Sequence, residues 1–361
     1  VVRMPAGPTV VITPWNAPFM LSTWKCSPAL AAGNTVILKP SEMTPAVSAV
    51  MAEVIASLFP TNEVALFEGS LPTSQALLDL PFDHIFFTGG ERVGRLVMAA
   101  AAQHLTPVTL ELGGKSPAVV LNDADLTVTS RRLVWGKCLN AGQTCIAPDY
   151  LLVQRGVAAP LIQKLGERIG ACFGADPLAS PDLASIVNAG QFARLQQLLQ
   201  GAQQRGQVLF GGQSDAARRR MAPTLIRVER LDDPLMAEEL FGPLLPVLEV
   251  DDLPQAMAWI NGRPKPLALY LFSTSADAQR QLLEGTSSGG VCVNDVVMQV
   301  SVPELPFGGV GNSGMGTYHG EAGFLTFSHR RSVLRRPFQL DVPLRYPPYG
   351  QRLPLIRQLL R

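Results

Sequence analysis

The sequence predicts an α/β protein with two doubly wound parallel-sheet domains followed by a C-terminal arm. Short apolar runs alternate with helix-length segments over residues 9–112, and the same alternation continues with longer spacers after residue 113. The composition changes again beyond His329. Strands separated by helix-length segments imply right-handed crossovers between parallel strands. The predicted domains are therefore residues 1–112, 113–325 and 326–361.

The first domain has the alternation expected of a nucleotide-binding domain. An apolar helix ending at Ala32 is closed by Gly33, and a second helix is expected over residues 44–59. A strand begins almost at once, with nothing before it to cover it, so we expect an N-terminally truncated domain. The predicted strands are residues 9–13, 35–39, 64–68, 84–88 and 108–112.

The second domain is expected to form its own sheet. Helices are predicted over residues 126–139, 158–170 and 187–205, and strands over residues 150–154, 224–228 and 267–272. Beyond His329 the chain has eight arginines against the single acid Asp341, and prolines in residues 345–350 break any helix there. This segment is expected to be an arm that packs on a subunit partner. A membrane-surface role is weaker, because residues 353–360 are few and interrupted by Pro354.

Composition restricts the classes of function. Hydrophobic residues make up 47% of the 361, charged residues 16%, and the net charge of +1 gives no basic field for nucleic acid or an anionic membrane. No apolar run is long enough for a membrane span, and no secretion signal is seen. Five scattered cysteines without a Cys-x-x-Cys pair indicate free thiols in a reducing, cytoplasmic setting. None of the four histidines has zinc-site spacing, so no metal is expected.

Cys145 is a candidate nucleophile. It ends the run Gly142-Gln143-Thr144-Cys145, which follows a helix that runs out near Asn140. Gly142 suits the left-handed residue after a helix end, so Cys145 should lie on a loop between helix and strand. A single cysteine is more often a small buried hydrophobe, and a loop position favours catalysis only modestly.

Glu111 is a candidate general base. It ends an apolar run and is followed by Gly113, Gly114 and Lys115. A carboxylate there is costly to bury without a purpose, and an apolar neighbourhood would raise its pKa as a base requires. The alternatives are an ion pair with Lys115 or a solvated strand end.

Two glycine patterns are set aside. Residues 114–116 resemble the end of a phosphate loop, but Thr109 stands where its first glycine belongs and Pro117 blocks the helix that must follow. Residues 309–314 match Gly-x-Gly-x-x-Gly but do not follow a strand. We interpret them as a flexible loop, not as a cofactor cradle.

A better cofactor candidate is the turn after the strand 84–88. Strand, glycine turn and helix from Glu91 would present amide donors to a pyrophosphate, and Gly94 would let that helix approach the sheet. An ordinary tight turn explains the pattern about equally well. The turn residues are Thr88, Gly89 and Gly90.

Lys39 and Glu42 stand at the C-terminal end of the second predicted strand. Ligands of open α/β sheets bind at that edge. The two side chains are placed to hold ribose hydroxyls, or they merely flank a loop.

Together these residues resemble the aldehyde dehydrogenase superfamily, in the family's order from Thr9 to His329. The motifs are Pro14-Trp15-Asn16, Lys39-Pro40-Ser41-Glu42, Phe87-Thr88-Gly89, Glu111-Leu112-Gly113-Gly114-Lys115, Gly142-Gln143-Thr144-Cys145, Glu239-Leu240-Phe241-Gly242-Pro243 and Pro306-Phe307-Gly308-Gly309. Class 3, with fatty, aromatic and coniferyl-type aldehydes as substrates, is the most similar. The class 3 runs are Trp135-Gly136-Lys137, Cys145-Ile146-Ala147-Pro148-Asp149-Tyr150, Asn294-Asp295-Val296-Val297 and Gly314-Met315-Gly316-Thr317-Tyr318-His319-Gly320.

The resemblance implies oxidation of an aldehyde to a carboxylic acid with NAD or NADP, in a homodimer. Cys145 would form a thiohemiacetal and then a thioester, Glu111 would be the base, and Asn16 would stabilise the oxyanion with the Cys145 backbone N–H. Trp135 and Thr144 would line the aldehyde pocket. The implied cofactor-binding residues are Trp15, Lys39, Glu42, Thr88, Gly89, Gly90, Gly94, Glu239 and Phe241.

The sequence departs from the family in three places. The family has an N-terminal helical segment and a bridging strand before the position of Val1, which we do not expect here. Some class 3 members end in a membrane anchor, which we also do not expect in this protein. Ala17 stands where class 3 often has an aromatic residue, so the substrate tunnel should be wider or differently shaped.

Three other functions stay open from the sequence. One is an inactive, truncated relative that binds nucleotide or serves structurally. Another is an acylating dehydrogenase that passes the thioester to coenzyme A, although Glu111 argues against it. The third is a papain-like cysteine hydrolase, for which no histidine stands in a suitable context. The choice between NAD and NADP is also open.

Overall fold

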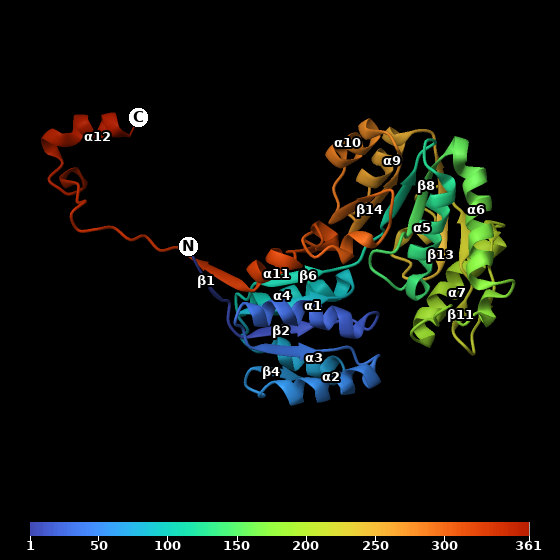
Figure 1. The fold of residues 1–361 in the computed structure, drawn as a ribbon, viewed down its shortest axis with the longest axis horizontal. Coiled ribbons are helices and arrows are strands. Elements are labelled where there is room, and N and C mark those ends of the chain that lie inside the picture. Colours follow the sequence, from blue (N-terminus) through green and yellow to red (C-terminus); the bar gives the residue numbers. More distant parts are fainter. Residues whose placement is uncertain (361) are drawn as a thin grey trace. The chain divides into compact units, whose positions relative to one another are not determined.

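The computed structural model describes residues 1–360, without the side chain of Gln351. Residues 5–328 form one compact unit, and residues 1–4 with those from 329 onward form another. The larger unit contains two mainly parallel sheets with helices around them (Figure 1). This confirms the predicted fold class. The division into a cofactor domain and a catalytic domain stays a prediction.

One sheet of the described chain has the strand order β16-β6-β5-β2-β3-β4. All its strands are parallel except β16, which runs antiparallel to β6. The chain winds outward from β2 in both directions, so the carboxyl ends of the parallel strands share one edge. The strands are β2 (Thr9–Ile12), β3 (Val36–Lys39), β4 (Val64–Leu66), β5 (His84–Thr88), β6 (Val108–Glu111) and β16 (Gly314–Met315).

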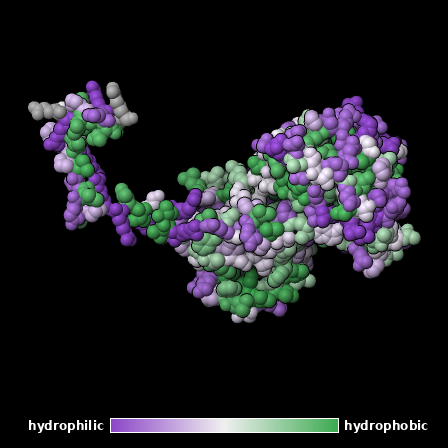
Figure 2. All heavy atoms as spheres, turned by 45° about the horizontal axis from the view of Figure 1, so that its top comes forward, coloured by the Kyte–Doolittle hydropathy of each residue, from purple (hydrophilic) through white to green (hydrophobic). Residues whose placement is uncertain are grey.

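The crossover helices of this sheet begin and end at residues suited to those places. Proline occupies the first turn of α1, α2 and α3, where its missing N–H needs no partner, and Gly33 follows α1 with φ of +86°. The outer face of α2 exposes valines, and hydrophobic side chains gather on the lower surface of the unit in Figure 2. The helices are α1 (Pro18–Ala31), α2 (Pro45–Leu58), α3 (Leu71–Leu78) and α4 (Glu91–Ala102).

The second sheet has the order β15-β14-β7-β8-β13-β12-β9. Its strands are β7 (Pro117–Val120), β8 (Tyr150–Gln154), β9 (Val208–Phe210), β12 (Thr224–Arg227), β13 (Leu244–Val250), β14 (Ala268–Phe272) and β15 (Gly290–Val293); β10 (Ser214–Asp215) and β11 (Arg220–Met221) form a separate hairpin. The helices are α5 (Leu126–Cys138), α6 (Arg155–Phe173), α7 (Ala189–Gln204), α8 (Pro234–Ala237), α9 (Leu253–Asn261), α10 (Ala276–Gly285) and α11 (Gly320–Thr326).

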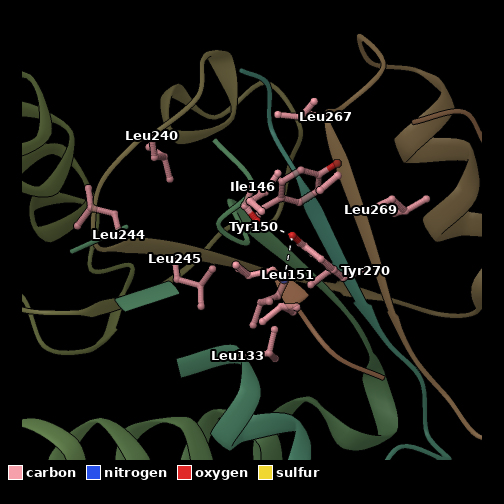
Figure 3. Packing of buried hydrophobic residues seen from close by; sticks show 14 of the residues in the cluster. Leu133, Ile146, Tyr150, Leu151, Leu240, Leu244, Leu245, Leu267, Leu269 and Tyr270 are labelled. Carbon is pink, nitrogen blue, oxygen red and sulfur yellow. Dashed lines mark hydrogen bonds between the residues drawn. The ribbon is translucent and has the colours of Figure 1, made fainter. Parts of the chain in front are cut away.

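A continuous hydrophobic core lies along this second sheet (Figure 3). Leu151 of β8, Leu245 of β13 and Leu269 of β14 are buried there, together with Leu133 of α5. Burying each such side chain stabilises the fold by roughly 1.5–3 kcal/mol. Tyr270 lies in the same core and has its hydroxyl turned toward the chain that follows α5.

The other unit contains a two-stranded sheet and the arm. β1 (Val2–Pro5) pairs with β17 (Ser328–Arg331), and α12 (Leu353–Leu359) lies near the end of the described chain. Pro354 was predicted to interrupt residues 353–360. That prediction is wrong, because Pro354 stands in the first turn of α12, where proline is tolerated.

Two other predictions concern the glycine patterns. Strand β7 follows Ser116, so residues 114–116 do not open the helix that a phosphate loop requires. The flexible loop expected at residues 309–314 is wrong, because Gly311–Ser313 form a 3-10 helix and Gly314–Met315 form β16 beside β6.

Candidate active site

A strained turn after α5 places Cys145. The backbone has positive φ at Asn140, Ala141 and Gly142, with values of 51°, 53° and 77°. A Cβ on Gly142 would collide with the carbonyl oxygen of Gly242, so glycine is required there. The chain then turns over the core, where the Tyr270 hydroxyl donates to the Ile146 carbonyl at 2.5 Å (Figure 3). The loop carrying Cys145 is therefore anchored to the core by this hydrogen bond.

Asn16 and Gln143 fix the other side of this loop. The Asn16 amide Nδ2 donates to the Gln143 carbonyl at 3.1 Å, and Asn140 Nδ2 donates to the Asn16 carbonyl at 3.0 Å. The buried Gln143 side chain donates to Ser185 O at 3.1 Å and accepts from Val187 N at 2.9 Å. Asn16 is thus hydrogen-bonded to the backbone two residues before Cys145.

Glu111 lies directly against the candidate nucleophile. Its side chain is 1% exposed, and its Oε1 is 3.8 Å from Cys145 Sγ. The other oxygen, Oε2, accepts from Lys25 Nζ at 2.8 Å, Thr88 Oγ1 at 3.0 Å and Tyr318 Oη at 2.7 Å. The structure therefore brings together Cys145, Asn16 and Glu111.

The charge state of Glu111 differs from the sequence-based expectation. Burial by itself raises the pKa of this carboxyl, but the buried Lys25 ammonium and the hydrogen bonds from Lys25, Tyr318 and Thr88 outweigh burial, so the pKa is lowered. The raised pKa that we predicted is wrong because Lys25 was not foreseen. Lys115, the partner considered from the sequence, instead forms an ion pair with Asp149.

The Cys145 thiol is set to stay protonated. Burial raises its pKa well above 9.0, and the negative charges of Glu111 and Glu239 raise it further, against a smaller opposing effect of Lys25. A thiol of this kind reacts only if a base takes its proton as it attacks. The adjacent Oε1 of Glu111 is the group in position to do so.

A cavity of about 840 Å³ opens onto these side chains. Glu111, Asn16 and Cys145 line it. Most of the residues predicted to bind a cofactor line it too, namely Trp15, Thr88, Gly89, Gly90, Glu239 and Phe241. Basic side chains that we did not predict also line it, namely Arg92, Arg95, Arg194, Arg263 and Lys265. The arrangement combines a thiol, a carboxylate, amide donors and cations suited to a phosphate-bearing ligand.

Comparison with known proteins identifies the family. Residues 1–333 match the model of the Aldehyde dehydrogenase family. The chain belongs to that family. It is 45% identical to aldehyde dehydrogenase family 3 member A2 of Mus musculus, over 96% of this chain and 71% of the relative. It is 46% identical to the dimeric NADP-preferring aldehyde dehydrogenase of Rattus norvegicus, over 97% and 77%.

A solved structure of a relative has the same fold. The substrate-bound state of Staphylococcus aureus AldH superposes with a TM-score of 0.95 at 43% identity, covering 99% of this chain and 78% of that one. The class 3 resemblance of the sequence is confirmed by these relatives. This aldehyde dehydrogenase oxidises aldehydes with NAD or NADP.

The aldehyde dehydrogenase has a glycine turn that fits a dinucleotide. A Cβ on Gly94 would be 2.6 Å from Leu112 Cδ2, so glycine lets α4 lie close to the end of β6, as predicted. Gly90 has open space where a Cβ would be, and the first turn of α4 lines the cavity. Trp15 and Phe241 pack edge to face at 5.4 Å across the cavity wall.

Glu239 is the second carboxylate of this cavity. Burial and the negative charge of Asp149 raise its pKa to about 8, although the Gly114 backbone N–H opposes this. A Cβ on Gly113 would collide with Glu239 Oε2, so the glycine pair of the Glu111 motif gives this side chain its room. Neither this protonation state nor the Gly113 contact was foreseen from the sequence.

Other predicted site residues lie elsewhere. Lys39 Nζ is 3.5 Å from Glu42 Oε2 and 2.9 Å from the Pro40 carbonyl, and neither side chain lines the 840 Å³ cavity. Trp135 lines a second cavity of about 600 Å³ with Arg131, Arg132 and Arg168. Thr144 is partly buried beside Cys145 and lines neither of these two cavities.

Two kinds of feature are absent from the described part of the chain. None of the helices there is long and apolar enough to cross a membrane. Nor do the described histidines, cysteines, aspartates and glutamates form a group of three or more that could hold a metal ion.

Proposed function

We propose that Cys145 is the nucleophile of this aldehyde dehydrogenase, Glu111 its base and Asn16 its oxyanion donor. The single observation that supports this most is the 3.8 Å contact between Cys145 Sγ and Glu111 Oε1 on the wall of the cavity. As Sγ bonds to the aldehyde carbon, its proton passes to Oε1 and the carbonyl oxygen gains the negative charge.

Asn16 can stabilise that charge without leaving its place. Its amide nitrogen has two hydrogens, and the Gln143 carbonyl takes one of them. The second hydrogen, with the Cys145 backbone N–H, is available to the oxyanion. A donor fixed in this way contributes roughly 3 kcal/mol to the transition state in comparable sites.

The cavity suits NAD(P), which supplies the hydride acceptor when bound. We propose that Thr88, Gly89 and Gly90 lie beside its pyrophosphate, with Gly94 allowing the approach. Trp15, Glu239 and Phe241 would hold the nicotinamide ribose and ring, and Lys39 and Glu42 the adenosine ribose. Trp135 and Thr144 would line the path of the aldehyde. The basic side chains that line the cavity, Arg194 among them, suit a dianionic pyrophosphate.

Release of the product needs Glu111 a second time. Glu111 first gives the proton it took from the thiol to solvent. Once the carbon on Cys145 is a thioester, Oε1 takes a proton from water as the water oxygen adds to that carbon, and this proton later returns to sulfur. The carbon–sulfur bond then breaks, the acid leaves, and the thiol is restored.

We propose three further properties of the protein. Residues 1–112 form the cofactor domain, and residues 113–325 form the catalytic domain. Residues 326–361 form an arm through which two copies pair as a homodimer, and the protein works in the cytoplasm. Supporting this, the name of the rat relative describes a dimer.

The nucleophile is tested by Cys145→Ala. We expect aldehyde-dependent formation of NAD(P)H to fall by more than roughly a thousandfold, while cofactor binding persists. Cys172→Ala, at another partly buried free cysteine, is the matched control and should keep activity. Turnover retained in the Cys145 variant would refute the assignment.

A further inference from the structure

Tyr318 reaches Glu111 from a segment far along the chain. The backbone around it has positive φ at Gly314, Gly316, His319 and Gly320, with values of 139°, 79°, 83° and 47°. A Cβ on Gly314 would collide with the Leu110 carbonyl, so glycine lets this segment lie against β6. Tyr318 also forms a bridge with Phe307, with both backbone hydrogen bonds at 2.8 Å. Its position is therefore firmly set by the backbone.

The phenol group lies inside a charged and aromatic enclosure. Tyr318 is fully buried, with edge-to-face contacts to Phe86 at 5.2 Å and Phe307 at 5.6 Å. Its hydroxyl is 3.2 Å from Lys25 Nζ and 2.7 Å from Glu111 Oε2. An ammonium group can only donate, so the Tyr318 oxygen accepts from Lys25 and its single hydrogen goes to Glu111.

The two oxygens of Glu111 consequently have different surroundings. Lys25, Thr88 and Tyr318 all donate to Oε2. Among the described residues, Cys145 Sγ donates to Oε1. The lone pairs of Oε2 are occupied, and those of Oε1 are available for a proton.

We propose that Tyr318 is a positioning residue that, together with Lys25, assigns the base function of Glu111 to a single oxygen, Oε1. The inference rests on the proposed role of Glu111. Without the phenol, Oε2 has fewer donors, and the carboxylate can turn either oxygen toward Cys145. The proton from the thiol, or later from water, then has no fixed acceptor.

The acid side of the pH profile reports this role. The titratable groups around Glu111 are Lys25 of α1, Cys145, and Tyr318 with His319 on the glycine-rich segment. Losing the Tyr318 hydrogen bond removes one of the influences that lower the pKa of Glu111. The acid limb of kcat/KM should therefore move up by about one pH unit.

The experiment compares Tyr318→Phe with the unaltered enzyme. We expect kcat to fall roughly tenfold and the aldehyde KM to change little. Tyr150→Phe, at another buried tyrosine, is the control and should leave the limb in place. Site-specific 3-fluorotyrosine at position 318 is a second variant that keeps the shape. Burial and the charge of Glu111 hold the pKa of the Tyr318 phenol well above 10.0, so the fluorinated phenol stays a donor, and a stronger one. It should move the limb down.

A double substitution separates this inference from the function on which it rests. In a Glu111→Gln background, Tyr318→Phe should cause no further loss of rate, because there is no base to position. An equal loss in both backgrounds, or an acid limb unmoved by both position 318 variants, would overturn the role of Tyr318. Full activity of Glu111→Gln alone would instead overturn the role of Glu111.

Discussion

Glu111 and Glu239 line the same cavity, yet their carboxyl groups titrate in opposite directions. The pKa of Glu111 is lowered, whereas that of Glu239 is raised to about 8. Both are desolvated, so burial alone does not separate them. The two pKa values differ because the lysines near the two carboxyls are paired differently.

Lys25 and Lys115 explain the contrast. Lys25 Nζ is 2.8 Å from Glu111 and stands in a buried helix face. Lys115 Nζ is near Glu239 but is already used by Asp149 and by the carbonyls of Leu235 and Glu238, each at 2.9 Å. Lys115 lowers the pKa of Glu239 only weakly, and burial together with the negative charge of Asp149 outweighs it.

The largest effect is expected from Glu111→Gln. An amide cannot take a proton from the thiol or from water, so kcat should fall by about 10²–10⁴-fold in a steady-state assay. The substitution also leaves Lys25 buried without its counter-ion. The neutral pair Lys25→Met with Glu111→Gln should therefore recover stability but no activity. Recovered activity in that double variant would mean that Glu111 acts only structurally.

The next effect is on folding. Lys25→Met leaves the buried Glu111 carboxylate without its ion-pair partner and should lower the free energy of unfolding by about 3–5 kcal/mol near neutral pH. The folded-state pKa of Glu111 lies below its unfolded value, so this contribution is present above the unfolded pKa and is lost as pH falls through the folded one. Chemical denaturation across that range measures it. A difference that persisted in strong acid would contradict the ion-pair explanation.

The smallest effect is expected at Glu239. Its carboxyl binds a proton in the folded state at pH values where the unfolded chain has lost it, so stability should fall as pH rises from about 4.5 to about 8. Glu239→Gln, which keeps the shape and stays neutral, should remove this dependence. Unfolding curves taken through that window test the point. Identical pH dependence in both proteins would show that Glu239 is ionised throughout.

The sequence predicted those elements that form short, locally recognisable apolar runs. The strands His84–Thr88 and Tyr150–Gln154 were predicted with the bounds that the structure gives them. Strand β13 was not predicted although it is long and buried, and it contains Pro246, a residue that central strands disfavour. The structure accommodates this proline because pairing with β8 begins only at Val247.

The sequence predicted those site residues that belong to motifs occurring in the family's order. Asn16 follows β2 and Glu111 ends β6 at one edge of the first sheet, and Cys145 meets them from the loop between α5 and β8. Lys25 was missed because a single lysine in an apolar helix has no pattern that marks an ion pair. Tyr318 was missed as a site residue because its partner is 207 residues away, and the preceding residues 309–314 were interpreted as a flexible loop.

That sequence separation has a consequence for how the enzyme is made. During synthesis, Cys145 and Glu111 emerge from the ribosome well before Tyr318, and domains fold as their residues appear. A nascent chain therefore exposes its thiol beside a carboxylate that still lacks a partner from the later segment. Pairing of β16 with β6 completes that neighbourhood. Until that pairing forms, the Glu111 carboxylate lacks one of the three donors that its Oε2 has in the folded protein.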